Sequence, residues 1–172
     1  MITAIIGPMR AGKTSHLINA LNREALADHS CALLIYGSEI HLHNKVTVHE
    51  NIKVFSSLND ILDHREVPNY DVLGIDEIQF QEIPIETLEL YAKNCKIIIS
   101  GLLANHRREM YPKTARVLEI ADNIIHLTAV CQICKKKSAA FSPRKIKEGP
   151  DRDTDSSFLS TCRECYFQRS WS

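Results

Sequence analysis

Short apolar runs alternate with amphipathic segments along most of the chain, and glycine or polar residues separate them. The first run covers Ile2–Ile6 and ends at Gly7. Short runs bounded by turn residues are typical of parallel strands that are buried on both faces. Beyond the following loop, apolar side chains recur at helical spacing, at Leu17, Ile18, Leu21, Ala25 and Leu26. The start of the chain therefore predicts a buried strand, a glycine-containing turn and a helix.

The same alternation continues to about residue 128. The pattern predicts further strands at Ala32–Tyr36, Ile52–Phe55, Val72–Ile75, Lys96–Ser100 and Ile124–Leu127. It predicts further helices at Leu58–Asp63, Pro84–Ala92 and Pro112–Ala121. Strands that alternate with helices indicate an α/β domain built on a mainly parallel sheet.

The alternation stops beyond Thr128. Basic residues between positions 135 and 147 precede aspartates between positions 151 and 155, with no apolar periodicity in either group. This composition predicts a loop. We therefore divide the chain into a larger α/β domain over residues 1–128 and a small second domain over residues 129–172.

Charge and length exclude some classes of function. The 172 residues include 21 Lys+Arg and 21 Asp+Glu, so the formal net charge is zero. Neutrality argues against binding to nucleic acid or anionic membranes through bulk positive charge. No apolar run reaches the roughly 18 residues of a membrane span, and the N-terminus has no signal-peptide pattern. We expect a cytoplasmic protein without a membrane partner.

The first predicted strand leads into a glycine-rich segment, Gly7-Pro8-Met9-Arg10-Ala11-Gly12-Lys13-Thr14. This is a complete G-x-x-x-x-G-K-T motif in its expected place between a strand and a helix, which makes a chance match the poorer explanation. The backbone N–H groups of the loop are expected to surround the phosphates of ATP. Lys13 would reach the β- and γ-phosphate oxygens, and the Thr14 hydroxyl would bind Mg²⁺.

Two acidic residues follow the predicted strand Val72–Ile75. Asp76 is expected to hold Mg²⁺ opposite Thr14, and Glu77 to orient a nucleophile and accept its proton. An apolar run that ends in two acids is often only a strand that meets solvent, but an intact phosphate loop favours the catalytic interpretation. The nucleophile stays open, because water would make the protein an NTPase and a substrate hydroxyl would make it a kinase.

The six cysteines fall into two kinds. Cys31 and Cys95 stand beside apolar runs, where a thiol is expected to pack as a small buried hydrophobe. The other four form C-x-x-C pairs on either side of residues 135–161: Cys131 with Cys134, and Cys162 with Cys165. Four thiolates turned toward one point make a tetrahedral Zn²⁺ site without an open position, which favours a structural metal.

The zinc interpretation has alternatives. A redox dithiol or two disulfides would use the same cysteine pairs, although disulfides are unusual in a reducing compartment. A zinc ribbon beside lysines could also contact nucleic acid. Against this, the net charge is zero, and Phe141 is the one aromatic residue among positions 135–150. We therefore expect no nucleic-acid partner.

Together these motifs resemble the type II thymidine kinase family, the cellular and viral thymidine kinases with a C-terminal zinc domain. The resemblance extends over nearly the whole chain. It rests on Gly7-Pro8-Met9 with Gly12-Lys13-Thr14, Asp76-Glu77-Ile78-Gln79-Phe80, Gly101-Leu102 with Arg108, Leu127-Thr128-Ala129-Val130-Cys131 with Cys134, and Cys162-Arg163-Glu164-Cys165-Tyr166-Phe167.

The resemblance implies transfer of the γ-phosphoryl group of ATP to the 5′-hydroxyl of thymidine, giving dTMP and ADP, in nucleotide salvage for DNA synthesis. It also implies a homotetramer that uses ATP, Mg²⁺ and a structural Zn²⁺. Glu77 would be the general base at the hydroxyl, and Phe80 would pack on the thymine base. The loop between the cysteine pairs would close over the nucleoside as a lasso and hold it through backbone groups within about Gly149–Phe158.

The resemblance also suggests the remaining site residues. Glu39 and Gln79 are assigned to the ATP and Mg²⁺ site, together with the phosphate loop and Asp76. The nucleoside site is expected to contain Phe80, Leu102, His106, Tyr111, Ser142 and Phe158.

Several positions depart from the family pattern. Glu39 and His41 replace an Asp-x-Arg, so a group that titrates at a pH of about 6.5 replaces a permanent cation. The other replacements are Leu103 for an acid, His106 and Tyr111 for phenylalanines, and Phe158 for a tyrosine. His106 and Tyr111 either alter the nucleoside specificity or leave it unchanged. In the second case, His106 faces solvent and Tyr111 keeps its ring in the place of the phenylalanine ring. A divergent nucleotide-binding protein without kinase activity and a zinc-ribbon NTPase are the alternative functions.

Overall fold

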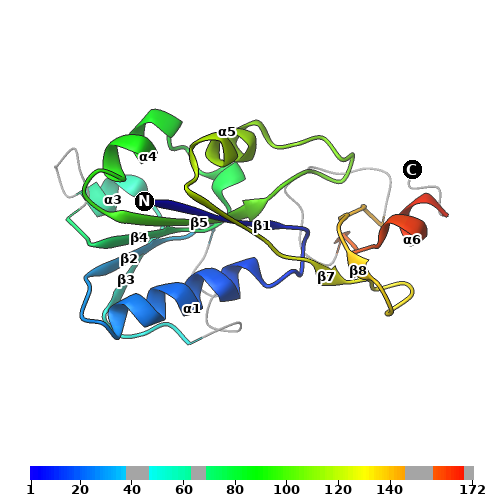
Figure 1. The fold of residues 1–172 in the computed structure, drawn as a ribbon, viewed down its shortest axis with the longest axis horizontal. Helices are drawn as coiled ribbons and strands as arrows, with labels where there is room; N and C mark the ends of the chain where they lie inside the picture. Colours follow the sequence, from blue (N-terminus) through cyan, green and yellow to red (C-terminus); the bar gives the residue numbers. More distant parts are fainter. Residues whose placement is uncertain (38–46, 63–68, 146–156, 169–172) are drawn as a thin grey trace.

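The computed structural model of the chain describes residues 1–37, 47–62, 69–145 and 157–168. Its centre is a six-stranded sheet in the order β3-β2-β4-β5-β1-β6, and every neighbouring pair is parallel (Figure 1). The strands are β1 (Ile2–Gly7), β2 (Cys31–Leu34), β3 (Ile52–Phe55), β4 (Val72–Ile75), β5 (Lys96–Leu102) and β6 (Asn123–His126). The mainly parallel α/β architecture predicted from the sequence is confirmed.

Helices cover both faces of this sheet. Helix α1 (Lys13–Ala25) lies on one face, and α3 (Leu58–Leu62), α4 (Ile85–Tyr91) and α5 (Pro112–Ile120) lie on the other (Figure 1). Alternate strand residues feed the two cores: Ile5 and Leu33 pack with α1, whereas Ala4 and Leu34 pack with α4. No helix in the described ranges combines the length and the apolar character needed to cross a membrane.

Most predicted elements are present with ends shifted by one or two residues. The clearest errors are Leu26 and Tyr36, which lie outside α1 and β2 and are 71% and 42% exposed. Both residues continue the apolar pattern in the sequence, but each lies beyond the last residue of its helix or strand and outside the core. The last strand is also less buried than predicted: β6 forms an edge of the sheet, and Ile124 is 52% exposed.

The carboxyl ends of three strands meet at the same edge of the sheet. Strand β5 lies between β1 and β4, with Gly7 opposite Leu102 and Ile75 opposite Ile99. The phosphate loop follows β1, and Asp76 follows β4. The strand order therefore separates these two segments by one strand, which brings the end of β5 between them as well.

The C-terminal part has short elements of its own. It contains β7 (Ala129–Val130) paired with β8 (Ser138–Ala139), two isolated bridges between residues 141–144 and 158–161, and helix α6 (Arg163–Phe167). The prediction of an unbroken loop over residues 135–155 was therefore wrong in its first part. Strands of two residues and single bridges are too short to show an apolar period that would mark them in the sequence.

Leu21 provides a test of the core beneath α1. It is fully buried, and a Cβ added at Gly74 of β4 would lie 2.5 Å from its Cδ1 atom, so Leu21 fills the space that the glycine leaves. Leu21→Ala should lower the free energy of unfolding by about 3–5 kcal/mol, because no neighbouring side chain replaces the lost volume.

Urea denaturation measures this change, and Leu26→Ala, directly after the last residue of the same helix, is the matched control. That side chain is largely exposed, so its removal should change stability by no more than about 0.5 kcal/mol. Equal losses from the two variants would contradict the packing described for α1.

Candidate active site

Two glycines determine the path of the loop between β1 and α1. A Cβ at Gly7 would lie 2.4 Å from the carbonyl oxygen of Leu127, so no side chain fits there. Gly12 has a φ of +79° and forms the N-cap of α1, in the left-handed region that favours glycine. The chain thus turns sharply from strand to helix, and the first N–H groups of α1 face the end of the sheet.

Lys13 lies inside this loop. Its side chain is buried, and its Nζ atom donates a hydrogen bond to the carbonyl oxygen of Pro8 at 2.9 Å. The ammonium group is therefore held against the loop itself. An anionic phosphate is a stronger partner for this group than a neutral carbonyl.

Thr14 and Asp76 meet across the end of the sheet. The Thr14 hydroxyl lies 3.0 Å and 3.3 Å from the two carboxylate oxygens of Asp76. Asp76 is 6% exposed, and its carboxylate also accepts a hydrogen bond from Ser100 at the end of β5. A hydroxyl and a carboxylate in contact are oxygen ligands that Mg²⁺ prefers, so these residues fit the metal.

Sequence reasoning missed Ser100 and Gln81. Ser100 is fully buried, and the side-chain amide of Gln81 donates to the backbone carbonyl oxygen of Asp76 at 2.9 Å. Both residues hold Asp76 in place. A polar residue at the end of an otherwise apolar strand was the available signal, because a buried hydroxyl requires a partner.

Glu77 has an unusual backbone conformation. Its φ of 50° and ψ of 51° place it in the left-handed region, where a residue with a side chain pays an energetic cost. The residue begins a short 3₁₀ helix, η1 (Ile78–Phe80), which turns the chain sharply at the end of β4. Such strain at an acidic residue beside a phosphate loop is typical of functional sites.

Gln79 connects Glu77 to the end of β5. Its side-chain nitrogen donates to the Glu77 carboxylate, and its side-chain oxygen accepts from the backbone N–H of Leu102 at 3.0 Å. Gly101 permits this approach, since a Cβ there would lie 2.8 Å from that same Gln79 oxygen. The sequence assigns Gln79 to the ATP and Mg²⁺ site, and in the structure its side-chain amide contacts the Glu77 carboxylate.

Several aromatic side chains predicted for the nucleoside site contact one another. Phe80 lies in ring contact with Tyr111 at 5.9 Å and with Tyr36 at 5.2 Å between centroids. His106 contacts Phe158 at 6.2 Å, and the guanidinium of Arg144 lies 5.4 Å from the centre of the Phe158 ring. The structure therefore joins four of the predicted nucleoside-site residues in two pairs.

The remaining predicted residues are placed differently. Leu102 is held at both backbone groups, by Gln79 and by the Thr114 hydroxyl at 2.9 Å. Ser142 contacts the phosphate loop, where its hydroxyl accepts a hydrogen bond from the N–H of Met9 at 2.9 Å. Glu39 and the departure His41 lie outside the described residues, as does most of the segment Gly149–Phe158, through which the predicted lasso would hold the nucleoside.

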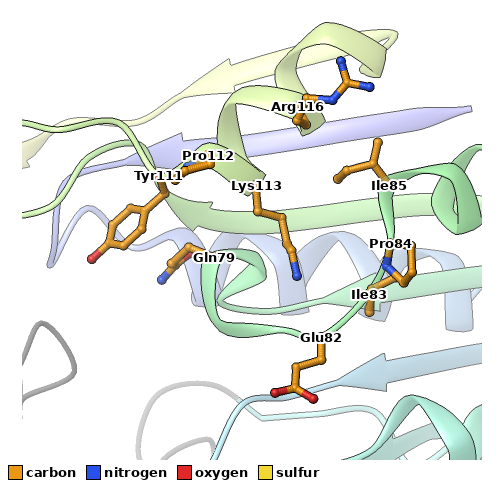
Figure 2. Close-up of a pocket in the computed structure, with 9 residues that line it drawn as sticks. All are labelled: Gln79, Glu82, Ile83, Pro84, Ile85, Tyr111, Pro112, Lys113 and Arg116. Carbon is orange, nitrogen blue, oxygen red and sulfur yellow. The ribbon is translucent and has the colours of Figure 1, made fainter.

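A pocket of about 650 Å³ opens beside the site, between η1 and α4 on one side and α5 on the other (Figure 2). Gln79 and Tyr111 lie at one end, and Ile85 and Arg116 lie at the other (Figure 2). Burial lowers the pKa of Lys113 in its wall, and nearby Glu82 partly opposes that shift. The pocket shares two side chains with the site.

The four paired cysteines form one cluster. The Sγ atoms of Cys131, Cys134, Cys162 and Cys165 all lie within 4.8 Å of one another, and Cys134 and Cys162 are 3.9 Å apart. Zinc–sulfur bonds of about 2.3 Å place the sulfur atoms of a tetrahedral site roughly 3.8 Å apart, whereas a disulfide requires about 2.05 Å. The spacing fits a metal and does not fit disulfides.

The thiols of this cluster differ in pKa. Burial raises the pKa of Cys131, but hydrogen bonds from the backbone N–H groups of Cys162, Cys134 and Ile133 outweigh it and lower the pKa to about 6. Burial and the neighbouring thiols raise the pKa of Cys165 to about 12. Four thiolates in this space would repel one another, and a metal ion held between them would offset that repulsion.

The two remaining cysteines match their predicted role. Cys31 and Cys95 are 1% and 5% exposed, and burial raises the pKa of each thiol to about 11. A thiol that stays protonated at neutral pH is a poor nucleophile and a poor metal ligand. The interpretation of both as buried hydrophobes is confirmed.

A glycine-rich loop between β1 and α1, whose Thr14 contacts Asp76 at the end of β4 two strands away, defines an α/β protein of the P-loop class. The family model described as thymidine kinase matches residues 1–166, and the chain belongs to the thymidine kinase family. The thymidine kinase of sheeppox virus (strain KS-1) is 34% identical over 178 residues, which cover 96% of each chain. Thymidine kinase 1 of Dictyostelium discoideum is 33% identical and covers 96% of this chain and 77% of its own.

A solved structure shares the fold alone. The flagellar accessory protein FlaH of Methanocaldococcus jannaschii superimposes with a TM-score of 0.51 at 13% sequence identity. The match covers 81% of this chain and 78% of that chain. This similarity supports the α/β architecture and gives no information about the reaction.

Loss of one cysteine ligand should remove the metal and leave the main sheet folded. In Cys131→Ser, the zinc content of reduced protein should fall from about one ion per chain toward zero, because three thiolates bind the ion far more weakly than four. Elemental analysis measures the metal, and far-ultraviolet circular dichroism measures the fold.

Cys95→Ala is the matched control, since its thiol lies in the core beneath α4. It should keep its zinc. Two results would contradict the assignment: wild-type protein that contains no metal when prepared in reducing buffer, or a Cys131→Ser variant that retains a full zinc content.

Proposed function

We propose that the protein transfers the γ-phosphoryl group of ATP to the 5′-hydroxyl of thymidine, forming dTMP and ADP in nucleotide salvage. The observation that carries this proposal is the juxtaposition of Thr14, Asp76 and Glu77 at the carboxyl ends of β1 and β4. A kinase and an NTPase differ in the group that accepts the phosphoryl: a substrate hydroxyl or water. Membership of the thymidine kinase family supports the substrate hydroxyl and therefore a kinase.

The phosphates of ATP would lie in the loop of residues 7–14. Its backbone N–H groups and the N-terminus of α1 attract negative charge, and Lys13 would exchange its contact with Pro8 for a phosphate oxygen. Thr14 and Asp76 would hold Mg²⁺, which neutralises charge on the β- and γ-phosphates when bound. Ser100 keeps the Asp76 carboxylate turned toward Thr14.

Glu77 would accept the proton of the acceptor hydroxyl. Phosphoryl transfer has a loose transition state, so an ordinary carboxylate accepts the proton late and needs no strongly raised pKa. Positioning is then the main requirement. The left-handed backbone of Glu77 and the amide of Gln79 provide it, because together they hold the carboxylate beside the end of β5.

The nucleoside would lie among the rings of Phe80, Tyr111, His106 and Phe158. Phe80 follows Glu77 by three residues on η1, so a base stacked on that ring lies within reach of the carboxylate. Tyr111 adds a hydroxyl and His106 adds ring nitrogens to an otherwise apolar wall. These polar atoms would decide which deoxynucleoside fits beside thymidine.

We further propose a structural zinc ion held by the four clustered cysteines, a division of the chain at residue 128, and a cytoplasmic homotetramer. The cluster spacing supports the zinc, and the separate two-stranded sheet that begins at Ala129 supports the division. The lasso proposed within Gly149–Phe158 would close over the nucleoside from this second domain.

Glu77→Gln tests the proposed base. The amide keeps the size of the side chain but cannot accept the proton, so the turnover number should fall by about 10²–10⁴-fold while the affinity for ATP changes little. Steady-state kinetics and isothermal titration measure the two quantities. Glu86→Gln, an exposed carboxylate on the first turn of α4, should retain wild-type activity. Undiminished transfer by Glu77→Gln would contradict the assignment.

The acceptor itself is tested with γ-labelled ATP and each of four deoxynucleosides, with a reaction lacking any acceptor as control. Label should appear in dTMP, and transfer to the other three should show how far Tyr111 and His106 broaden the site. The absence of labelled nucleotide with every acceptor would overturn the proposed function. Labelled phosphate released without an acceptor would indicate an NTPase.

A further inference from the structure

The middle of the phosphate loop is held by the C-terminal part of the chain. The N–H of Met9 donates to the Ser142 hydroxyl at 2.9 Å, and the carbonyl oxygen of Met9 accepts from the Ser160 hydroxyl at 2.6 Å. Both serines are buried, and Ser160 is fully so. One peptide unit on each side of Met9 is therefore fixed by residues more than 130 positions away in the sequence.

Arg10 makes a second connection. Its Nη1 atom donates to the side-chain oxygen of Gln132 at 2.7 Å and to the backbone carbonyl of Phe158 at 2.9 Å. The same Gln132 oxygen accepts the N–H of Ser160 at 2.9 Å. Arg10 has a φ of 61°, and a residue with a side chain keeps such a conformation only where other contacts hold it.

Two of these partners, Gln132 and Ser160, lie beside the clustered cysteines in the sequence. Gln132 lies between Cys131 and Cys134, and Ser160 precedes Cys162 by two residues. The backbone of Gln132 also donates to the carbonyl of Ser160 at 2.9 Å, which joins the two cysteine-bearing segments. Ala11, the next residue of the loop, packs against the cluster formed by Ala129, Ala139 and the cysteines.

We propose that the metal-loaded cysteine cluster sets the conformation of the phosphate loop through Gln132 and Ser160, so that zinc and ATP bind cooperatively. The inference rests on the proposed role of residues 7–14 as the ATP-phosphate loop. Zinc fixes the two cysteine-bearing segments relative to each other. Those segments hold Met9 and Arg10, so the phosphate loop already has the conformation that binds ATP. Binding of ATP then carries no further entropic cost for ordering the loop.

Because of thermodynamic linkage, the proposal can be tested through the affinity for zinc or through the affinity for ATP. If zinc favours the loop conformation that binds ATP, then ATP must raise the affinity for zinc by the same factor. A structural metal that only stabilises its own loops predicts no such coupling. Gln132 and Ser160 are positioning residues, because they act on the phosphates only through the loop.

The test is the affinity for zinc, measured in competition with a chromogenic chelator, with and without saturating MgATP. In the wild-type protein, MgATP should raise the zinc affinity by about five-fold or more. Gln132→Leu removes the acceptor for Arg10 and should reduce this coupling to less than about two-fold, with one zinc ion still bound at low chelator. Gln132→Glu keeps an acceptor at that place and should preserve the coupling.

Gln168→Leu is the matched control, the same replacement at an exposed position of the second domain, and it should couple as the wild type does. Ser160→Ala provides an independent variant, which loses the hydroxyl bond to Met9 and should also lower the coupling. Wild-type protein without coupling, or full coupling retained in both Gln132→Leu and Ser160→Ala, would overturn the proposal. The measurement needs no acceptor, so failure of thymidine phosphorylation leaves it unaffected and the two results are separable.

Discussion

The contact between the Thr14 hydroxyl and the Asp76 carboxylate is the constraint on which the rest of the site depends. It joins the start of α1 to the end of β4 at 3.0 Å, and it exists only because β5 alone separates β1 from β4. The buried Ser100 on that intervening strand then completes the environment of the carboxylate. Parallel strands bring their carboxyl ends to one edge, so catalytic groups from distant segments meet there.

Two residues of the site have strained backbone conformations. Arg10 and Glu77 both have positive φ values, at 61° and 50°. Neither conformation is favoured locally, and each residue makes a side-chain contact: Arg10 with the distant Gln132, and Glu77 with the nearby Gln79. Strain of this kind is kept where it orients a reacting group, and the surrounding fold offsets its cost.

Among the residues that the structure describes, the departures His106, Tyr111 and Phe158 fall at positions predicted for the nucleoside, whereas Glu39 and His41, predicted for the phosphate side, lie outside the described residues. Tyr111 and His106 replace phenylalanines, yet each still makes an aromatic contact, with Phe80 and Phe158 respectively. Both side chains therefore combine an aromatic contact with polar atoms. We expect a change of this kind to affect which base is accepted and not the phosphoryl transfer itself.

The sequence by itself determined the alternation of strands and helices, the phosphate loop, the acidic pair after β4 and the four cysteine ligands. Each of these depends on local spacing or on residue types adjacent in the chain. Tertiary structure alone decided the roles of Ser100, Gln79 and Gln132, and the position of Ser142 against the phosphate loop. Those residues act through partners between 2 and 133 positions away, and which partner each one meets depends on strand order and packing that no local pattern records.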